Sequence, residues 1–126
     1  MQSQKAKEIF HVGEDLAAKF LETKGYTILR RNYRAKTGEI DIIATHEDVL
    51  VFVEVKTRSK HSIRQALMNV SHTKRKRISL TAQRYIIQEP ECVKTRIRFD
   101  IIVLLYFSNT DSYQIEHLED AFLPEL

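Results

Sequence analysis

Cysteine, glycine and proline are scarce in this 126-residue sequence. The single cysteine, Cys92, excludes an intramolecular disulfide and any paired-cysteine redox or zinc motif. This cysteine usage suits a reducing compartment, and we expect a cytoplasmic protein. With three glycines and two prolines, the chain has no linker-rich segment and no glycine-rich phosphate loop.

Long hydrophobic runs are also missing. Charged residues interrupt the amino-terminal segment throughout, so it reads neither as a signal peptide nor as a membrane span. Because 43% of the residues are hydrophobic, a chain of this length can bury one core. We therefore expect a soluble single domain over residues 1–126.

Charge is unevenly distributed, although the formal net charge is only +3. Residues 56–88 contain nine lysines and arginines and no acidic residue, whereas residues 108–126 contain acidic residues and no basic ones. A one-sided positive field is typical of a protein that binds a phosphate backbone. A solvated basic helix face is the alternative, and the sequence leaves both open. The candidate nucleic-acid contacts are Arg58, Lys60, Arg64, Lys74, Arg75 and Arg77.

Hydrophobic periodicity predicts an α/β order of elements. Residues 5–24 have helical spacing and end at Gly25. After three strands, residues 62–88 are predicted to form one helix, or two with Ser71 capping the second. An apolar run at 99–107 predicts a strand covered on both faces. The three earlier strands span 26–34, 39–46 and 49–57, and a short strand at 114–117 and a helical turn at 119–123 complete the prediction.

The second and third predicted strands form a hairpin with charged residues on one face. Alternation puts Glu54 and Lys56 on the same side of the third strand. A two-residue turn would set Asp41 opposite Glu54, and Glu39 opposite Lys56. Side chains that face each other begin about 5 Å apart at Cβ, so two carboxylates there can share a small cation.

Such a constellation suits the hydrolysis of a phosphodiester bond. A hard divalent cation held by Asp41 and Glu54 would neutralise charge at the phosphate and activate a water molecule. Lys56 could orient or deprotonate that water. Glu14, at the margin of the apolar stripe of the first helix, could turn into the same groove. Surface salt bridges and an ordinary boundary glutamate are the alternatives.

The residues around the hairpin resemble the PD-(D/E)xK nuclease superfamily and, within it, the YraN-like family of small predicted endonucleases. The core of the resemblance is Gly38-Glu39-Ile40-Asp41 followed by Val51-Phe52-Val53-Glu54-Val55-Lys56-Thr57-Arg58. Further matches extend along the chain at Gly13-Glu14, Ala17, Gly25-Tyr26, Arg31-Asn32-Tyr33, Lys74, Arg98-Phe99-Asp100 and Asp120-Ala121-Phe122.

This resemblance implies a restriction endonuclease-like core of order α-β-β-β-α-β, with a central mixed sheet flanked by helices. It assigns Asp41 to the motif aspartate and Glu54 and Lys56 to the Glu-x-Lys pair. Glu14 is similar to the helix glutamate that completes the metal site of archaeal Holliday junction resolvases. The resemblance also implies Mg²⁺ or Mn²⁺ as the cofactor, DNA rather than RNA as the partner, and a homodimer.

Two departures from the family pattern are visible. Ile40 replaces the proline that names the superfamily, but proline is not a ligand and the chemistry does not require it. Residues 59–66 lack the glycine expected in YraN-like sequences, which bears on the shape of the substrate entrance.

Three functions are compatible with these residues. The first is a metal-dependent endonuclease acting on DNA, with branched or damaged DNA among the candidate substrates. The second is a nucleic-acid-binding module of nuclease ancestry without turnover. The third is an interaction protein or metabolic enzyme that reuses the fold. Outside this site, we expect Arg98 and Asp100 to pair within the sheet and the five histidines to lie at the surface.

Overall fold

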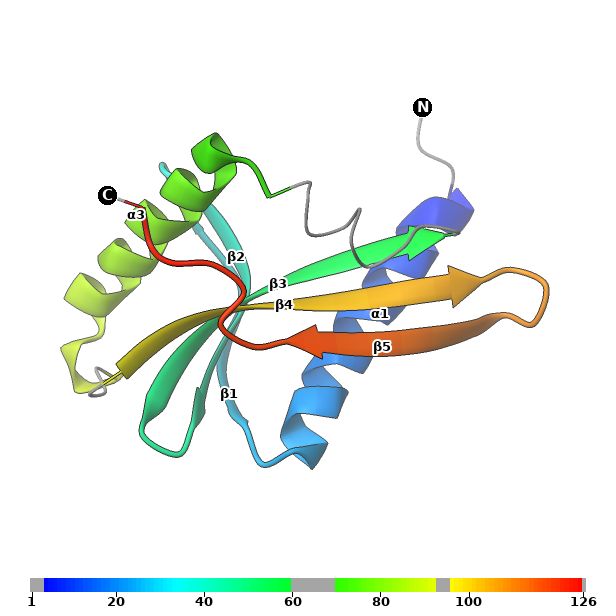
Figure 1. Cartoon of the computed structure of the whole chain (residues 1–126), viewed down its shortest axis with the longest axis horizontal. Helices are drawn as coiled ribbons and strands as arrows, with labels where there is room; N and C mark the ends of the chain where they lie inside the picture. Colours follow the sequence, from blue (N-terminus) through cyan, green and yellow to red (C-terminus); the bar gives the residue numbers. More distant parts are fainter. Residues whose placement is uncertain (1–3, 60–69, 93–95, 126) are drawn as a thin grey trace.

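The computed structural model describes residues 4–59, 70–92 and 96–125, in which a five-stranded sheet is flanked by helices (Figure 1). The strands lie in the order β1-β2-β3-β4-β5. β3 pairs with β4 in parallel and the other neighbours are antiparallel. This mixed sheet confirms the predicted α/β class and is compatible with a restriction endonuclease-like core. The elements are α1 (Gln4–Thr23), β1 (Thr27–Ala35), β2 (Gly38–His46), β3 (Val49–Ser59), α3 (His72–Gln88), the short 3-10 helix η1 (Pro90–Cys92), β4 (Arg96–Phe107) and β5 (Ser112–Leu118).

Both predicted helix signals are confirmed in the described residues. Gly25 follows α1 with a φ of 92°, a conformation that glycine adopts easily, and Tyr26 N donates to Leu21 O at 3.0 Å. At the start of α3, Ser71 Oγ accepts a hydrogen bond from Lys74 N at 3.2 Å. The earlier part of the predicted helical region, residues 62–69, lies outside the described residues.

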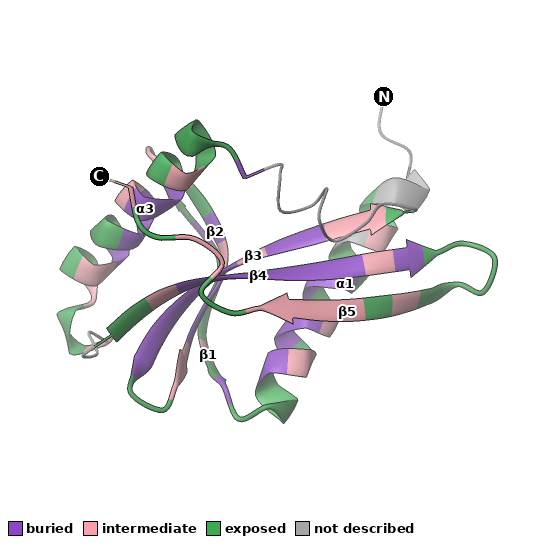
Figure 2. Cartoon of the chain, viewed as in Figure 1, coloured by how far each residue is buried: buried purple, intermediate pink, exposed green. Residues whose placement is uncertain are grey.

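Each helix covers one face of the sheet. On the α1 face, Ala17 and Leu21 pack with the odd-numbered valines of β3, from Val49 to Val55. On the α3 face, Ile78 packs with the even-numbered positions of β3 that carry apolar side chains. Figure 2 shows that β3 and β4 are largely buried, whereas β5 at the sheet edge is mostly half-buried. No helix in the described part of the chain is long and apolar enough to cross a membrane.

The predicted helical turn at 119–123 is wrong. Asp120 has a φ of 54°, which lies outside the helical region. Its amide donates to Asp100 Oδ1 at 2.9 Å, and the amide of Ala121 donates to Phe99 O at 2.7 Å. Because β4 takes these two donors, the segment follows the sheet, and Phe122 stacks on Phe99 on the α3 face.

Candidate active site

The β2–β3 hairpin has the predicted register over most of its length. A two-residue turn places His46 opposite Val49, and the same register continues to Ile42 opposite Val53. Glu54 lies immediately after that last pair, on the side of β3 that faces α3. The local rules of turn length and alternation therefore bring β2 and β3 together as expected.

Asp41 lies where the β2–β3 ladder ends. Val55 N donates to Asp41 Oδ2 at 2.8 Å. On the other side of β2, Glu39 pairs with Arg34 of β1 and forms an ion pair with it at 3.0 Å. The predicted backbone pairs of Asp41 and Glu39 with β3 therefore do not form, because a side-chain oxygen of Asp41 takes the β3 amide instead.

The electrostatic environment of Asp41 is unusual for a carboxylate. Burial raises the pKa of Asp41 to about 7, although the hydrogen bond from Val55 N acts in the opposite direction. The negative charges of Glu54, Glu14 and Glu39 raise it further. Asp41 is thus surrounded by like charges, and a cation beside it would be favourable.

Glu14 is held near Asp41 by a close approach of α1 to β3. A Cβ added to Gly13 would lie 2.4 Å from Thr57 Oγ1, so glycine permits this contact. Glu14 itself is buried, and burial raises its pKa, while the nearby charge of Arg31 lowers it. Its side chain is thus buried, whereas its turn into the groove of Asp41 and Glu54 stays a prediction.

Glu54 and Lys56 lie on the same side of β3, as predicted. Glu54 has a side chain only 12% exposed and forms an ion pair with Lys74 of α3 through Oε1. Its other oxygen, Oε2, is buried and has no hydrogen-bond partner among the described residues. Lys56 is buried as well, and this burial lowers the pKa of its ammonium, an effect that the charge of Glu54 opposes.

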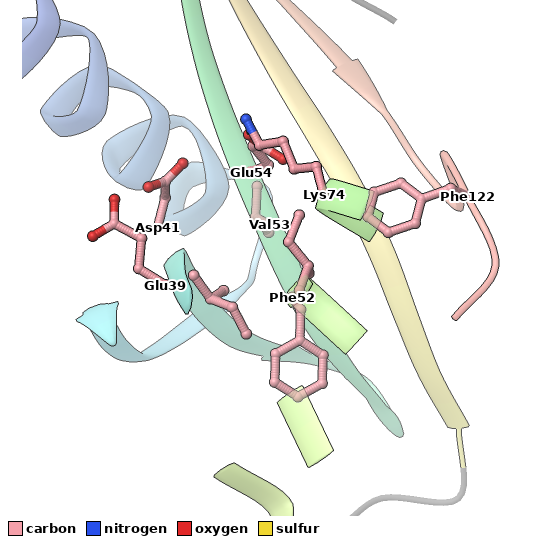
Figure 3. Close-up of a pocket in the computed structure, with 9 residues that line it drawn as sticks. Glu39, Asp41, Phe52, Val53, Glu54, Lys74 and Phe122 are labelled. Atoms are coloured by element: carbon pink, nitrogen blue, oxygen red, sulfur yellow. The ribbon is translucent and has the colours of Figure 1, made fainter. Parts of the chain in front are cut away.

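Asp41, Glu54 and Lys74 line a small cavity of about 90 Å³ between β2, β3 and α3, whereas Glu14 and Lys56 are not among its lining residues. Figure 3 shows Asp41 and Glu39 on one side of it, and Glu54 with the Lys74 ammonium beside it on the other. The cavity is lined by Glu39, Ile40, Asp41, Phe52, Val53, Glu54, Lys74, Ile78 and Phe122.

The donor set fits a hard divalent cation that keeps part of its water shell. Within residues 4–59, 70–92 and 96–125, no three or more His, Cys, Asp or Glu side chains are grouped closely enough to hold an ion by themselves. Mg²⁺, however, is commonly bound through one or two carboxylates and several waters. Asp41 and the partnerless Oε2 of Glu54 provide two such oxygens. Glu14 as a third ligand stays a prediction.

The predicted nucleic-acid contacts have different surroundings. Arg77 is exposed and lines, with Lys74, a groove of about 300 Å³ beside the cavity. Arg58 donates to the backbone oxygen of Thr57 at 2.9 Å. Arg75 forms an ion pair with Glu125 at 2.7 Å and is therefore tied to the C-terminal segment. The other two predicted contacts, Lys60 and Arg64, lie outside the described residues.

Comparison with known proteins identifies the family. Residues 13–104 match the family described as "Uncharacterised protein family UPF0102". The chain belongs to the UPF0102 family. A UPF0102 protein of Dictyoglomus turgidum is 40% identical over 116 residues, which cover 92% of this chain and 98% of that protein. A second, from Clostridium perfringens strain SM101, is 39% identical over 116 residues, covering 92% of this chain and 94% of the relative.

A third UPF0102 protein, from Desulforapulum autotrophicum, is 38% identical over 122 residues, or 97% of this chain and 98% of the relative. The predicted YraN-like membership is thus confirmed. The family match includes Glu14, Asp41, Glu54, Lys56 and Lys74. The family description names no reaction, so an inference about function has to come from the site.

This UPF0102 protein also contains a buried polar network near the C-terminal end of α1. Arg98 forms two hydrogen bonds with the fully buried Asp100, at 2.8 and 2.9 Å, as predicted. His117 Nε2 lies 2.8 Å from Asp100 Oδ2, and Lys24 Nζ lies 2.8 Å from His117 Nδ1. The expectation of a surface position is wrong for His117, whose side chain is only 3% exposed.

Burial alone would raise the pKa of Asp100, but the hydrogen bonds of His117 and Arg98 hold it below its usual value. The carboxylate is therefore charged and fully paired, which suits a structural role.

The sequence did not predict the partner of Glu54 either. Lys74 was noted for its match to the family, but its distance of 20 positions along the chain gave no signal of an ion pair.

Proposed function

We propose that this UPF0102 protein is a metal-dependent endonuclease that hydrolyses phosphodiester bonds in DNA. The observation that supports the proposal is that neighbouring strands bring two carboxylates to one cavity, with a buried lysine two positions further along β3. Asp41 and Glu54 present carboxylates at a shielded cavity, and Lys56 presents a buried amine on the same side of β3 as Glu54.

The cation would be Mg²⁺ or Mn²⁺, which, when bound, neutralises charge on the phosphate and activates water. Asp41 and Glu54 would hold it, with Glu14 as the proposed third carboxylate. The ordinary competitor for Asp41 is a proton, because burial and like charges raise its pKa to about 7. The site therefore favours metal binding at neutral to alkaline pH.

Lys56 would act on the water and on the phosphate. Its pKa is lowered chiefly by burial, so the amine gives up its proton more readily than an exposed lysine. In that state Lys56 Nζ can accept a proton from the attacking water; in its charged state it can stabilise negative charge on the phosphate. In either role the burial of Lys56 strengthens the interaction by excluding solvent.

The substrate side of the proposal rests on the basic residues beside the cavity. Lys74 and Arg77 line the adjacent groove and are suited to phosphate oxygens. DNA is proposed over RNA, and a homodimer is proposed as well, from the resemblance to junction resolvases. Branched and damaged DNA are the substrates to test first.

A DNA-binding protein without turnover is the second candidate. One observation favours it: Lys74 already supplies a positive charge to Glu54, so that carboxylate is compensated without a metal ion. Such a protein would retain the basic groove and would have no use for the amine of Lys56. Cleavage and binding measured on the same substrates separate the two candidates.

The test is a cleavage screen over single-stranded, duplex, flap and four-way-junction DNA with Mg²⁺, Mn²⁺ or a chelator. The proposal expects cleavage of at least one substrate with metal and none with chelator. Lys56→Ala, purified identically, controls for contaminating nucleases and should be inactive while still binding the DNA. Binding of DNA by the wild type without cleavage under any of these conditions would favour the binding protein.

A further inference from the structure

The ion pair between Lys74 and Glu54 stands out because it joins a helix to the centre of the proposed metal site. Lys74 belongs to the first turn of α3, and its side chain is 46% exposed. Its ammonium contacts Oε1 of Glu54, whereas Oε2 is buried without a hydrogen-bond partner in the described part of the chain. Lysine thus holds one carboxylate oxygen of Glu54, and the other has no partner among the described residues.

The backbone of Lys74 is fixed, but its side chain is free to change partner. Ser71 Oγ accepts from Lys74 N, and Thr37 and Thr81 hydroxyls are hydrogen-bonded at 2.7 Å where α3 meets the start of β2. The lysine stem is long and half exposed, so moving its ammonium requires no movement of the helix. The groove shared with Arg77 gives that ammonium a solvent-accessible position away from Glu54.

We propose that Lys74 is a built-in counter-ion of the metal site, which occupies Glu54 in the metal-free protein and leaves it when a divalent cation binds. This inference rests on the proposed function, since it assumes that Glu54 is a metal ligand. A lysine offers one charge and only hydrogen-bond donors, whereas a divalent ion bound at Oε2 would bring two positive charges beside the ammonium and repel it. Lys74 therefore prevents a buried, uncompensated carboxylate and lowers the apparent affinity for metal.

The charge pattern around the cavity is consistent with this role. Glu54, Glu14 and Glu39 all add negative charge near Asp41, and like charges that cannot be neutralised destabilise the folded state. Lys56 already lies on β3 beside Glu54 but is buried, so it cannot leave as readily. Lys74, by contrast, is a half-exposed lysine of α3 that lines the cavity.

The experiment compares Mn²⁺ binding by calorimetry, without DNA, for the wild type, Lys74→Met and Lys76→Met. Lys76 is exposed on the same turn but does not line the cavity. Its variant loses one positive charge, as Lys74→Met does, and therefore controls for the change in net charge. Lys74→Met should bind Mn²⁺ more tightly by roughly fivefold, and Lys76→Met should bind it like the wild type. Without metal, Lys74→Met should also have the lowest melting temperature of the three and gain the most from added Mn²⁺.

The outcomes separate this inference from the proposed function. If the wild type binds Mn²⁺ and Lys74→Met binds it equally or more weakly, Lys74 is not a competitor and the inference is wrong, while the metal site stands. If no variant binds Mn²⁺, both fail. If only Lys74→Met binds it, the counter-ion role is supported, but the wild-type protein is then a nuclease-derived binder and not a metal-dependent enzyme.

Discussion

Replacing Asp41 by asparagine should change the pH dependence of folding stability in a defined direction. In the folded protein, burial is the main cause that raises the pKa of Asp41 from 3.8 to about 7. The folded state therefore binds this proton more tightly than the unfolded state does. The stability that the proton provides is fully present below the unfolded pKa and is lost as the pH rises through the folded pKa.

The size of the effect follows from that window. From about pH 5 to about pH 7 the unfolded state has lost the proton while the folded state retains it, and each pH unit costs about 1.4 kcal/mol. Wild-type protein should therefore lose about 3 kcal/mol through this group between about pH 5 and pH 8. Asparagine has no proton to lose and keeps an oxygen that can accept the hydrogen bond from Val55 N.

The assay is urea unfolding of both proteins at these two pH values, with a chelator present. Relative to wild type, Asp41→Asn should gain about 3 kcal/mol on going from the lower to the higher pH. Glu22→Gln, which neutralises an exposed carboxylate on α1, should show no such gain. A stability difference between Asp41→Asn and wild type that is constant with pH would refute the described environment of Asp41.

Three further predictions concern other parts of the molecule. Gly13→Ala should lower the free energy of unfolding by about 2 kcal/mol, because the new Cβ meets Thr57 Oγ1, and Thr57→Ala should partly rescue it in urea unfolding. Asp100→Asn should cost about 3 kcal/mol by the same assay, since it removes the buried negative charge that Arg98 and His117 share; a negligible loss would argue against the network's structural role. The double variant Lys74→Ala, Arg77→Ala should reduce the salt slope of log K for duplex DNA by about 1.8 if both contact phosphates, and an unchanged slope would exclude this groove as the contact surface.

The strands and their faces could be predicted because the rules involved are local. The alternation in β3 assigns Val53 and Val55 to one side and Glu54 and Lys56 to the other, and the helices cover those sides accordingly. The two-residue turn sets the register of the hairpin. The alternation and the turn length depend only on neighbours in the chain, so both can be predicted without tertiary information.

The missed features all depend on packing between distant segments. The β2–β3 ladder ends early because the side chain of Asp41 binds the Val55 amide, and no pattern in either strand encodes this bond. The segment after β5 is not helical because β4 takes its amides. His117 is buried because it pairs with the charged Asp100 of β4, whereas composition alone favours an exposed histidine.

The most direct test of the proposed site is thermal unfolding of the wild type and Asp41→Asn with and without Mn²⁺. Metal that binds only the folded protein raises the melting temperature in proportion to RT ln(1 + [metal]/Kd). We expect wild-type protein to be stabilised by Mn²⁺, less so as acid protonates the ligands, and Asp41→Asn to show no metal-dependent shift. A wild-type protein that Mn²⁺ does not stabilise, or an equal shift in both proteins, would contradict the account of Asp41 and Glu54 as a metal site.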